Sequence, residues 1–134
     1  MTLVIDSSAV AAALVEAGAR GSWSRELLGR AELMAPHHML VEVASVLRRL
    51  VREGKTPDDQ ATRAHAGLIA VPFELFPYAP FASRIWELRA NVTPYDAWYV
   101  ALAEALDAPL ATFDGRLTRA PGPRCRFEIF PGST

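Results

Sequence analysis

The sequence predicts an α/β domain built on a five-stranded parallel sheet. Five short apolar segments alternate with helical patterns, and such alternation indicates right-handed crossovers with helices on both faces of a sheet. The first apolar segment, residues 2–5, is apolar on both faces, which is typical of a central strand in a parallel sheet. The 134 residues, 51% of them hydrophobic, suffice for one core, so we expect a single domain over residues 1–134.

Each predicted strand is a short apolar run that ends at a polar or breaking residue. Asp6 ends the first run and Pro36 ends the second. The five predicted strands are TLVI at 2–5, ELMA at 32–35, FELFPY at 73–78, LATF at 110–113 and RFEIF at 126–130.

The predicted helices carry recognisable start and stop signals. Pro57 and Pro94 stand at first helical positions, directly after the capping residues Thr56 and Thr93. The strongest amphipathic pattern spans residues 37–54. The six predicted helices run from Ser7 to Gly18, over 22–30, over 37–54, from Thr56 to about Ala70, from Pro80 to Arg89, and from Thr93 to the break at Asp107-Ala108-Pro109.

Composition narrows the class of protein. The single cysteine, Cys125, excludes an intramolecular disulfide, and no apolar stretch approaches the roughly 20 residues of a membrane span. The N-terminus has no basic segment and no cleavage pattern, so we expect a cytoplasmic location. The net charge of −1 does not indicate nucleic-acid binding. The 13 arginines against one lysine suit phosphate contacts, although a GC-rich genome gives the same bias.

Four carboxylates are candidate functional residues because of their positions relative to the predicted strands and helices. Asp6 follows the first strand and Asp114 follows the fourth, so both lie at the carboxyl edge of the sheet, where ligands gather in this fold class. Asp96 lies in the first turn of the helix before strand four, and because two helices follow strand three, topology alone does not fix its edge. Glu42 lies beside the apolar face of its helix, where burial is costly without a partner.

Four converging carboxylates would repel one another strongly without a counter-charge. Hard divalent cations such as Mg²⁺ or Mn²⁺ bind oxygen ligands and remove that repulsion. Each acid also has a structural interpretation: Asp96 forms a capping box with Thr93, Asp114 forms a turn, Asp6 caps the next helix, and Glu42 pairs with an arginine. The other eleven acids are interpreted as solvated surface charge.

Three further groups of residues carry weaker signals. The adjacent histidines, His37 and His38, match no zinc spacing and are interpreted as structural or surface residues. The three tryptophans are interpreted as core or interface anchors. Arg48, Arg49 and Arg52 form a basic helix segment. We expect it to be a solvated face, and contact with RNA phosphates is the alternative.

The four acids and their surroundings resemble those of a known family. The motifs are VIDSSAV around Asp6, HMLVEVASVLRRL around Glu42, TPYDAWYVALAEAL around Asp96, and ATFDGRL around Asp114. Together they resemble a PIN domain of the VapC type, the ribonuclease toxins of bacterial toxin–antitoxin pairs, over nearly the whole chain. Two departures, Trp98 and Phe113, concern packing or substrate and leave the acids intact.

The resemblance implies a three-layer α/β/α fold and a metal-dependent endoribonuclease that cleaves structured RNA such as tRNA or rRNA. It further implies that Asp6, Glu42, Asp96 and Asp114 hold one or two Mg²⁺ or Mn²⁺ ions, and that Ser7 or Ser8 and Thr112 support them. A homodimer is implied, as is an antitoxin bound on an apolar groove that includes Trp23.

Three other hypotheses compete with this one. A receiver-like signalling domain needs an acid pair after strand one and a lysine after strand five, whereas the only lysine is Lys55, between two helices. A housekeeping PIN-domain nuclease would have no antitoxin gene beside its own. A catalytically silent PIN-like scaffold that only binds RNA or protein is disfavoured because all four acids are present.

Overall fold

A five-stranded parallel sheet forms the centre of the protein, which confirms the predicted fold class. In this computed structural model, which describes residues 1–132, the strand order is β3-β2-β1-β4-β5 and every neighbouring pair is parallel. The strands are β1 (Thr2–Ile5), β2 (Glu32–Pro36), β3 (Glu74–Phe76), β4 (Leu110–Ala111) and β5 (Phe127–Glu128). The chain leaves β1 toward β2 on one side and returns to β4 on the other, so the strand order reverses at β1.

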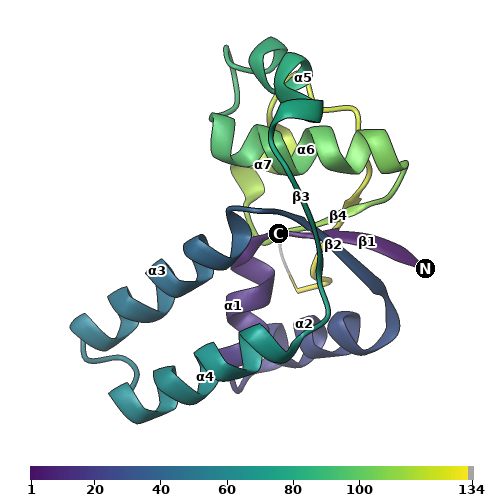
Figure 1. Ribbon diagram of the computed structural model, residues 1–134. Coiled ribbons are helices and arrows are strands. Elements are labelled where there is room, and N and C mark those ends of the chain that lie inside the picture. Colours follow the sequence, from purple (N-terminus) through teal and green to yellow (C-terminus); the bar gives the residue numbers. More distant parts are fainter. Residues whose placement is uncertain (133–134) are drawn as a thin grey trace.

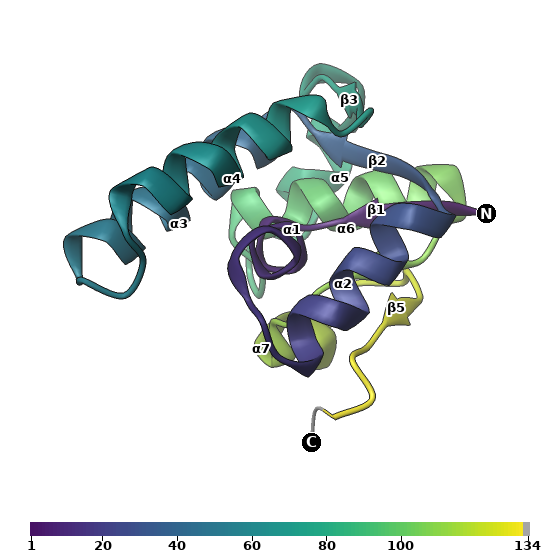
Figure 2. The same cartoon turned by 90° about the horizontal axis from the view of Figure 1, so that it is seen from below.

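Helices cover both faces of the sheet and make the three predicted layers. Helices α5 and α6 lie on one side, and α1 to α4 lie on the other, with α3 and α4 side by side and extending away from the sheet (Figures 1 and 2). The helices are α1 (Ser7–Val15), α2 (Ala19–Arg30), α3 (Met39–Arg52), α4 (Asp58–Ala70), α5 (Ala82–Glu87), α6 (Pro94–Leu106) and α7 (Gly115–Arg119), with a 3₁₀ turn at Ala79–Phe81.

The core sits where β1 meets its covering helices. Leu3, Val4 and Ile5 are completely buried, as expected for a strand that is apolar on both faces. Helix α6 contributes a nearly continuous buried segment from Ala97 to Ala103 and contacts β1, β2 and β4. The N-terminus of α6 is therefore fixed with respect to three strands of the sheet.

One predicted helix start is corrected by the structure and two are confirmed. Helix α1 begins at Ser7 as predicted, and its cap is Asp6, whose side chain accepts a hydrogen bond from the Ala9 amide. The α4 cap is Pro57 rather than Thr56, because the Pro57 carbonyl accepts the first helical hydrogen bond, from the Ala61 amide. The predicted α6 start at Thr93 is confirmed.

Several elements are shorter than, or absent from, the prediction. Strand β4 ends at Ala111 because the next amides bond side chains: the Phe113 amide donates to Ser8 Oγ. Strands β3 and β5 also lose residues at their ends, and Pro80 starts a 3₁₀ turn before α5 instead of a continuous helix. Helix α1 ends at Val15, before Gly18, and α2 begins earlier than predicted. Helix α7 was predicted only as a turn at Asp114.

In residues 1–132, none of the helices combines the length and the apolar character that crossing a bilayer would require.

The buried central strand should dominate stability. We expect Ile5→Ala to lower the free energy of unfolding by about 2–5 kcal/mol, because it removes a fully buried side chain and leaves a cavity. Ile69→Ala is the matched control, because Ile69 is 61% exposed and its loss should cost less than about 1 kcal/mol. Urea unfolding of both variants measures the difference, and equal losses would contradict this account of the core.

Candidate active site

The parallel pairing of β1 with β4 brings the first and last of the four acids to one edge of the sheet. Ile5 is in register with Ala111, and the Asp6 amide donates to the Ala111 carbonyl at 3.1 Å. Asp6 and Thr112 are thus the first residues beyond two neighbouring strands, and Asp114 follows two residues later. The carboxyl-edge placement predicted for Asp6 and Asp114 is confirmed.

The Asp6 carboxylate is buried, being only 6% exposed, and is surrounded by hydrogen-bond donors. It accepts from Ser8 Oγ at 2.6 Å, from the Ala9 amide at 3.2 Å and from the Thr112 hydroxyl. Burial nevertheless raises the pKa of Asp6 to about 6, because desolvation outweighs these bonds and the nearby Asp96 charge adds to the rise. The site therefore holds a carboxylate that the protein alone stabilises incompletely.

Ser8 and Thr112 join the loops after β1 and β4. Besides bonding Asp6, Ser8 Oγ accepts from the Phe113 amide at 3.1 Å, and Thr112 Oγ1 accepts from the Asp114 amide at 3.0 Å. Asp114 Oδ1 in turn accepts from the amides of Arg116 and Leu117, at 2.9 and 3.3 Å, and so caps the short helix α7. The two loops are consequently held in a fixed relation to each other.

Asp96 lies at the same edge, which answers the question that topology left open. The Asp96 amide donates to Thr93 Oγ1 at 3.3 Å, so Thr93 caps the helix, and the Asp96 carboxylate also bonds the Thr93 side chain. Partial burial, followed by the charges of Asp114 and Glu42, raises the pKa of the Asp96 carboxyl. Asp96 and Asp114 also line the same hollow, so these two side chains lie close together.

Glu42 reaches this group from α3 on the other side of the sheet edge. Its Oε1 accepts a 2.6 Å hydrogen bond from the Tyr99 hydroxyl of α6, and His38 Nε2 lies 3.4 Å from the same atom. Burial first, and then the Glu42 charge, raises the pKa of Tyr99 far above its usual range, so the phenol keeps its proton and donates. The partner of Glu42 is thus a tyrosine, not an arginine.

The donor set fits a hard divalent cation in its chemistry, because all four side chains offer carboxylate oxygens. Within residues 1–132, however, no three His, Cys, Asp or Glu side chains surround a common point closely enough to hold an ion as they stand. The carboxylates instead bond protein donors, as Asp114 does at α7. Joint coordination of one ion would therefore require these side chains to rotate.

A hollow of about 220 Å³ opens beside Asp96 and Asp114. Its polar lining includes Asn91 and Thr93, which precede α6, and Arg116 of α7. The hollow therefore combines two carboxylates with one cation at the mouth of the site. A phosphate-containing group could meet both kinds of charge there.

The remaining predicted residues have different surroundings. Ser7 faces Tyr99 rather than a carboxylate, and its side-chain hydrogen bond partly offsets the rise in the Tyr99 pKa. The basic segment lies on the exposed part of α3, where Arg49 lies 4.0 Å from Glu53. Trp23 is half-buried in a cluster with Phe113 and Phe130, and the antitoxin groove expected around it stays a prediction.

Sequence analysis missed Tyr99 and His38 as neighbours of Glu42. Tyr99 is three residues after Asp96, so the helical repeat places both on one face of α6, and this spacing was an available signal. His38 precedes Glu42 by four residues, but its ring is fixed by contacts that only the fold reveals. It stacks on Trp98 at 4.6 Å, and Nε2 lies 3.0 Å from the Tyr95 carbonyl.

Comparison with known proteins agrees with this fold. A family model described as PIN domain matches residues 3–123, so the chain belongs to the PIN-domain family. Within that family it belongs to the VapC proteins. It is 42% identical over 130 residues to Ribonuclease VapC1 of Mycobacterium tuberculosis, covering 94% of this chain and 96% of that protein. It is 37% identical over 129 residues to VapC ribonuclease Mb0985 of Mycobacterium bovis, covering 96% and 98%.

Solved structures share the fold at lower sequence identity. VapC20 of M. tuberculosis, described as a toxin that cleaves the sarcin-ricin loop, superposes with a TM-score of 0.67 at 20% identity, covering 87% of this chain and 93% of that one. VapBC2 of Rickettsia felis, bound to a DNA fragment from its promoter, superposes with a TM-score of 0.69 at 14% identity, covering 97% and 99%. At these identities the likeness concerns the fold alone.

The raised pKa of Asp6 predicts a pH-dependent stability. The folded state holds the Asp6 proton more tightly than the unfolded state, whose value is near 3.8, so stability is fully present below about pH 4 and is lost as pH rises through about 6. Asp6→Asn should therefore be more stable than the parent at pH 7.5, by up to roughly 3 kcal/mol, and equal to it near pH 4. Urea unfolding in EDTA between pH 4 and 8 measures this, and a variant less stable at pH 7.5 would refute it.

Proposed function

We propose that this protein is a divalent-metal-dependent endoribonuclease and the toxin of a VapBC-type toxin–antitoxin pair. The observation that carries the proposal is the gathering of Asp6, Glu42, Asp96 and Asp114 at the sheet edge where the strand order reverses. Its similarity to ribonuclease VapC1 along nearly the full chain supports the same activity. The whole chain acts as one cytoplasmic domain on structured RNA such as tRNA or rRNA, and inhibits translation until an antitoxin neutralises it.

In this proposal the four carboxylates hold one or two Mg²⁺ or Mn²⁺ ions. A cation bound there lowers the pKa of an attacking water and offsets the charge that builds up on the scissile phosphate. Ser8 and Thr112 orient Asp6 by hydrogen bonds, and Ser7 supports the same loop. Burial of Asp6 keeps bulk water away from one side of the site, which strengthens every electrostatic interaction within it.

The RNA backbone needs cations beyond the carboxylates. Arg116 lines the hollow beside Asp96 and Asp114, and Arg49 lines a second hollow, of about 430 Å³, that begins at Ser8 and runs between α1 and α3. In this proposal both arginines contact phosphates of the RNA backbone. RNA contact by Arg48, Arg49 and Arg52 stays a prediction; the three side chains line one hollow on α3 together with Ser45 and Glu53.

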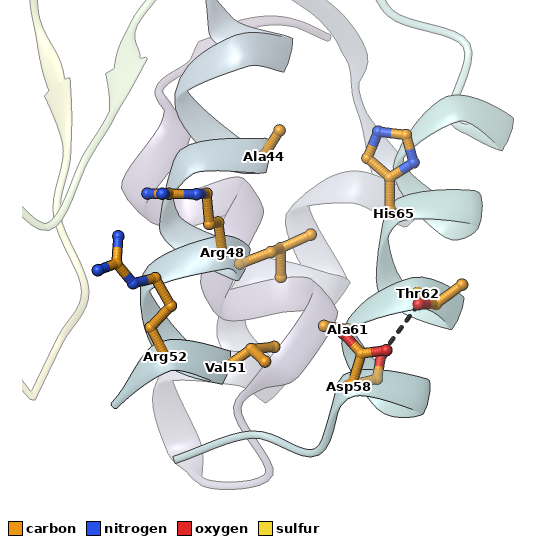
Figure 3. Close-up of a pocket in the computed structure, with 9 residues that line it drawn as sticks. Ala44, Arg48, Val51, Arg52, Asp58, Ala61, Thr62 and His65 are labelled. Carbon is orange, nitrogen blue, oxygen red and sulfur yellow. Dashed lines mark hydrogen bonds between the residues drawn. The ribbon is translucent and has the colours of Figure 1, made fainter. Parts of the chain in front are cut away.

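The antitoxin is assigned to the groove between α3 and α4, of about 330 Å³. Figure 3 shows its apolar lining, including Ala44, Val51 and Ala61, with Arg48 and Arg52 along the α3 rim. His65, Thr62 and Asp58 line the α4 rim. An apolar floor beside two arginines suits an amphipathic segment with acidic residues, and a homodimer with such a segment on each copy is proposed.

Two rivals remain separable by experiment. A housekeeping nuclease with the same site would cleave RNA but have no antitoxin encoded beside it. A silent scaffold would bind RNA without cleaving it, although the retention of all four acids favours an active enzyme. The proposed function is tested first by cleavage and then by partner binding.

Removal of one carboxylate should abolish cleavage without loss of the fold. We expect Asp96→Asn to lower the rate of RNA cleavage at least about 100-fold, because it removes a negative ligand while the Asp96 amide still donates to Thr93. EDTA should stop the parent completely. Discrete fragments from total cellular RNA are the measurement, with Asp59→Asn, an exposed acid on α4, as the matched control. Cleavage by Asp96→Asn at the parental rate would refute the assignment.

Charge reversal in the α3–α4 groove should weaken antitoxin binding. Arg48→Glu with Arg52→Glu should reduce affinity for the protein encoded beside the toxin gene at least about 10-fold, because the groove loses two cations and gains two anions. Arg63→Glu is the control, since Arg63 lies on α4 outside the groove and pairs with Asp59. Unchanged antitoxin binding with reduced RNA affinity would instead assign Arg48 and Arg52 to RNA.

A further inference from the structure

Tyr99 is a core residue whose polar end reaches the proposed metal site. The residue is 1% exposed, and its ring packs within the main hydrophobic core. Its hydroxyl donates to Glu42 Oε1 at 2.6 Å, across 57 residues of sequence. The position of the hydroxyl is therefore set by core packing, and not by a flexible surface side chain.

Glu42, by contrast, is a long side chain whose one hydrogen bond within residues 1–132 comes from Tyr99. The side chain is 27% exposed, and His38 Nε2 lies 3.4 Å from Oε1. That histidine is itself fixed, since its ring stacks on Trp98 with an angle of 1° between the planes. Tyr99 is thus the donor to Oε1, since His38 Nε2 bonds the Tyr95 carbonyl at 3.0 Å, and within residues 1–132 no hydrogen bond to Oε2 is found.

Helix α6 presents a carboxylate and a donor on the same face. Asp96 and Tyr99 are three residues apart, so they lie one above the other along the helix. The hydroxyl bonds Glu42 at 2.6 Å, and the charges of Glu42 and Asp6 both raise the pKa of Tyr99. A phenol can donate to a carboxylate there without adding a further negative charge.

We propose that Tyr99 is a positioning residue for the metal site, whose hydroxyl fixes Glu42 through Oε1 and leaves Oε2 for the divalent cation. This inference rests on the proposed function, because it gives Tyr99 a role only if Glu42 is a metal ligand. Hydrogen bonds to ligating carboxylates restrict their rotation, and loss of such a partner typically weakens metal affinity 10–100-fold. A purely structural hydroxyl would affect folding alone.

The test is Mn²⁺ affinity of Tyr99→Phe, measured by calorimetry or by the electron paramagnetic resonance of free Mn²⁺, without RNA. We expect Kd to rise roughly 10-fold, because Phe keeps the ring and removes only the hydroxyl. Tyr78→Phe is the matched control, since Tyr78 is partly exposed and lies outside the acid group, and its Kd should equal that of the parent. Equal Kd values for Tyr99→Phe and the parent would overturn the inference.

A double-mutant cycle separates positioning from a general structural effect. In a Glu42→Gln background the additional Tyr99→Phe change should alter Mn²⁺ affinity less than about twofold, because the side chain that Tyr99 positions has lost its charge. The same weakening in both backgrounds would overturn the inference. If the parent protein binds no Mn²⁺, the proposed function itself is refuted. If the parent binds Mn²⁺ and Tyr99→Phe binds it equally tightly, only the role of Tyr99 is refuted.

Discussion

The burial of the Asp6 carboxylate at the end of the central strand is the constraint on which the rest of this site depends. A protein that needed only a helix cap at this position could use serine or asparagine and avoid the cost of desolvating a charge. Instead the carboxylate is retained, and burial, together with the nearby charge of Asp96, raises its pKa to about 6. This arrangement lowers the free energy of unfolding, and a site that binds a cation explains why it is kept.

Local sequence signals were sufficient for the architecture. The residues around β1 are apolar on both faces, which identified the central strand, and Thr93 with Pro94 located the start of α6 to the residue. Because parallel strands align their carboxyl ends, the meeting of Asp6 with Asp114 followed directly from the strand assignments. These features depend on residues close in sequence or on a general rule of parallel sheets, so one sequence was enough to predict them.

Contacts between distant segments were beyond sequence reasoning. Strand β4 ends early because Ser8 Oγ accepts a hydrogen bond from the Phe113 amide, which a longer strand would have used for pairing. Ser8 and Phe113 are 105 residues apart in sequence. The edge occupied by Asp96 depends on how α6 packs on three strands, and the pairing of Glu42 with Tyr99 depends on the approach of α3 to α6. Helix α7 contains only five residues and is stabilised by the Asp114 cap, so it carries no periodic pattern to detect.

The central claim, that these carboxylates gather for a divalent cation, is tested most directly by thermal unfolding of the purified protein against Mn²⁺ concentration at pH 7.5. A ligand that binds only the folded state stabilises it by about 2.7 kcal/mol at one hundred times its Kd. The account predicts an unfolding midpoint that rises steadily with Mn²⁺, and rises less at pH 5, where protons compete for Asp6. A midpoint independent of both Mn²⁺ and Mg²⁺ up to millimolar concentrations would contradict it.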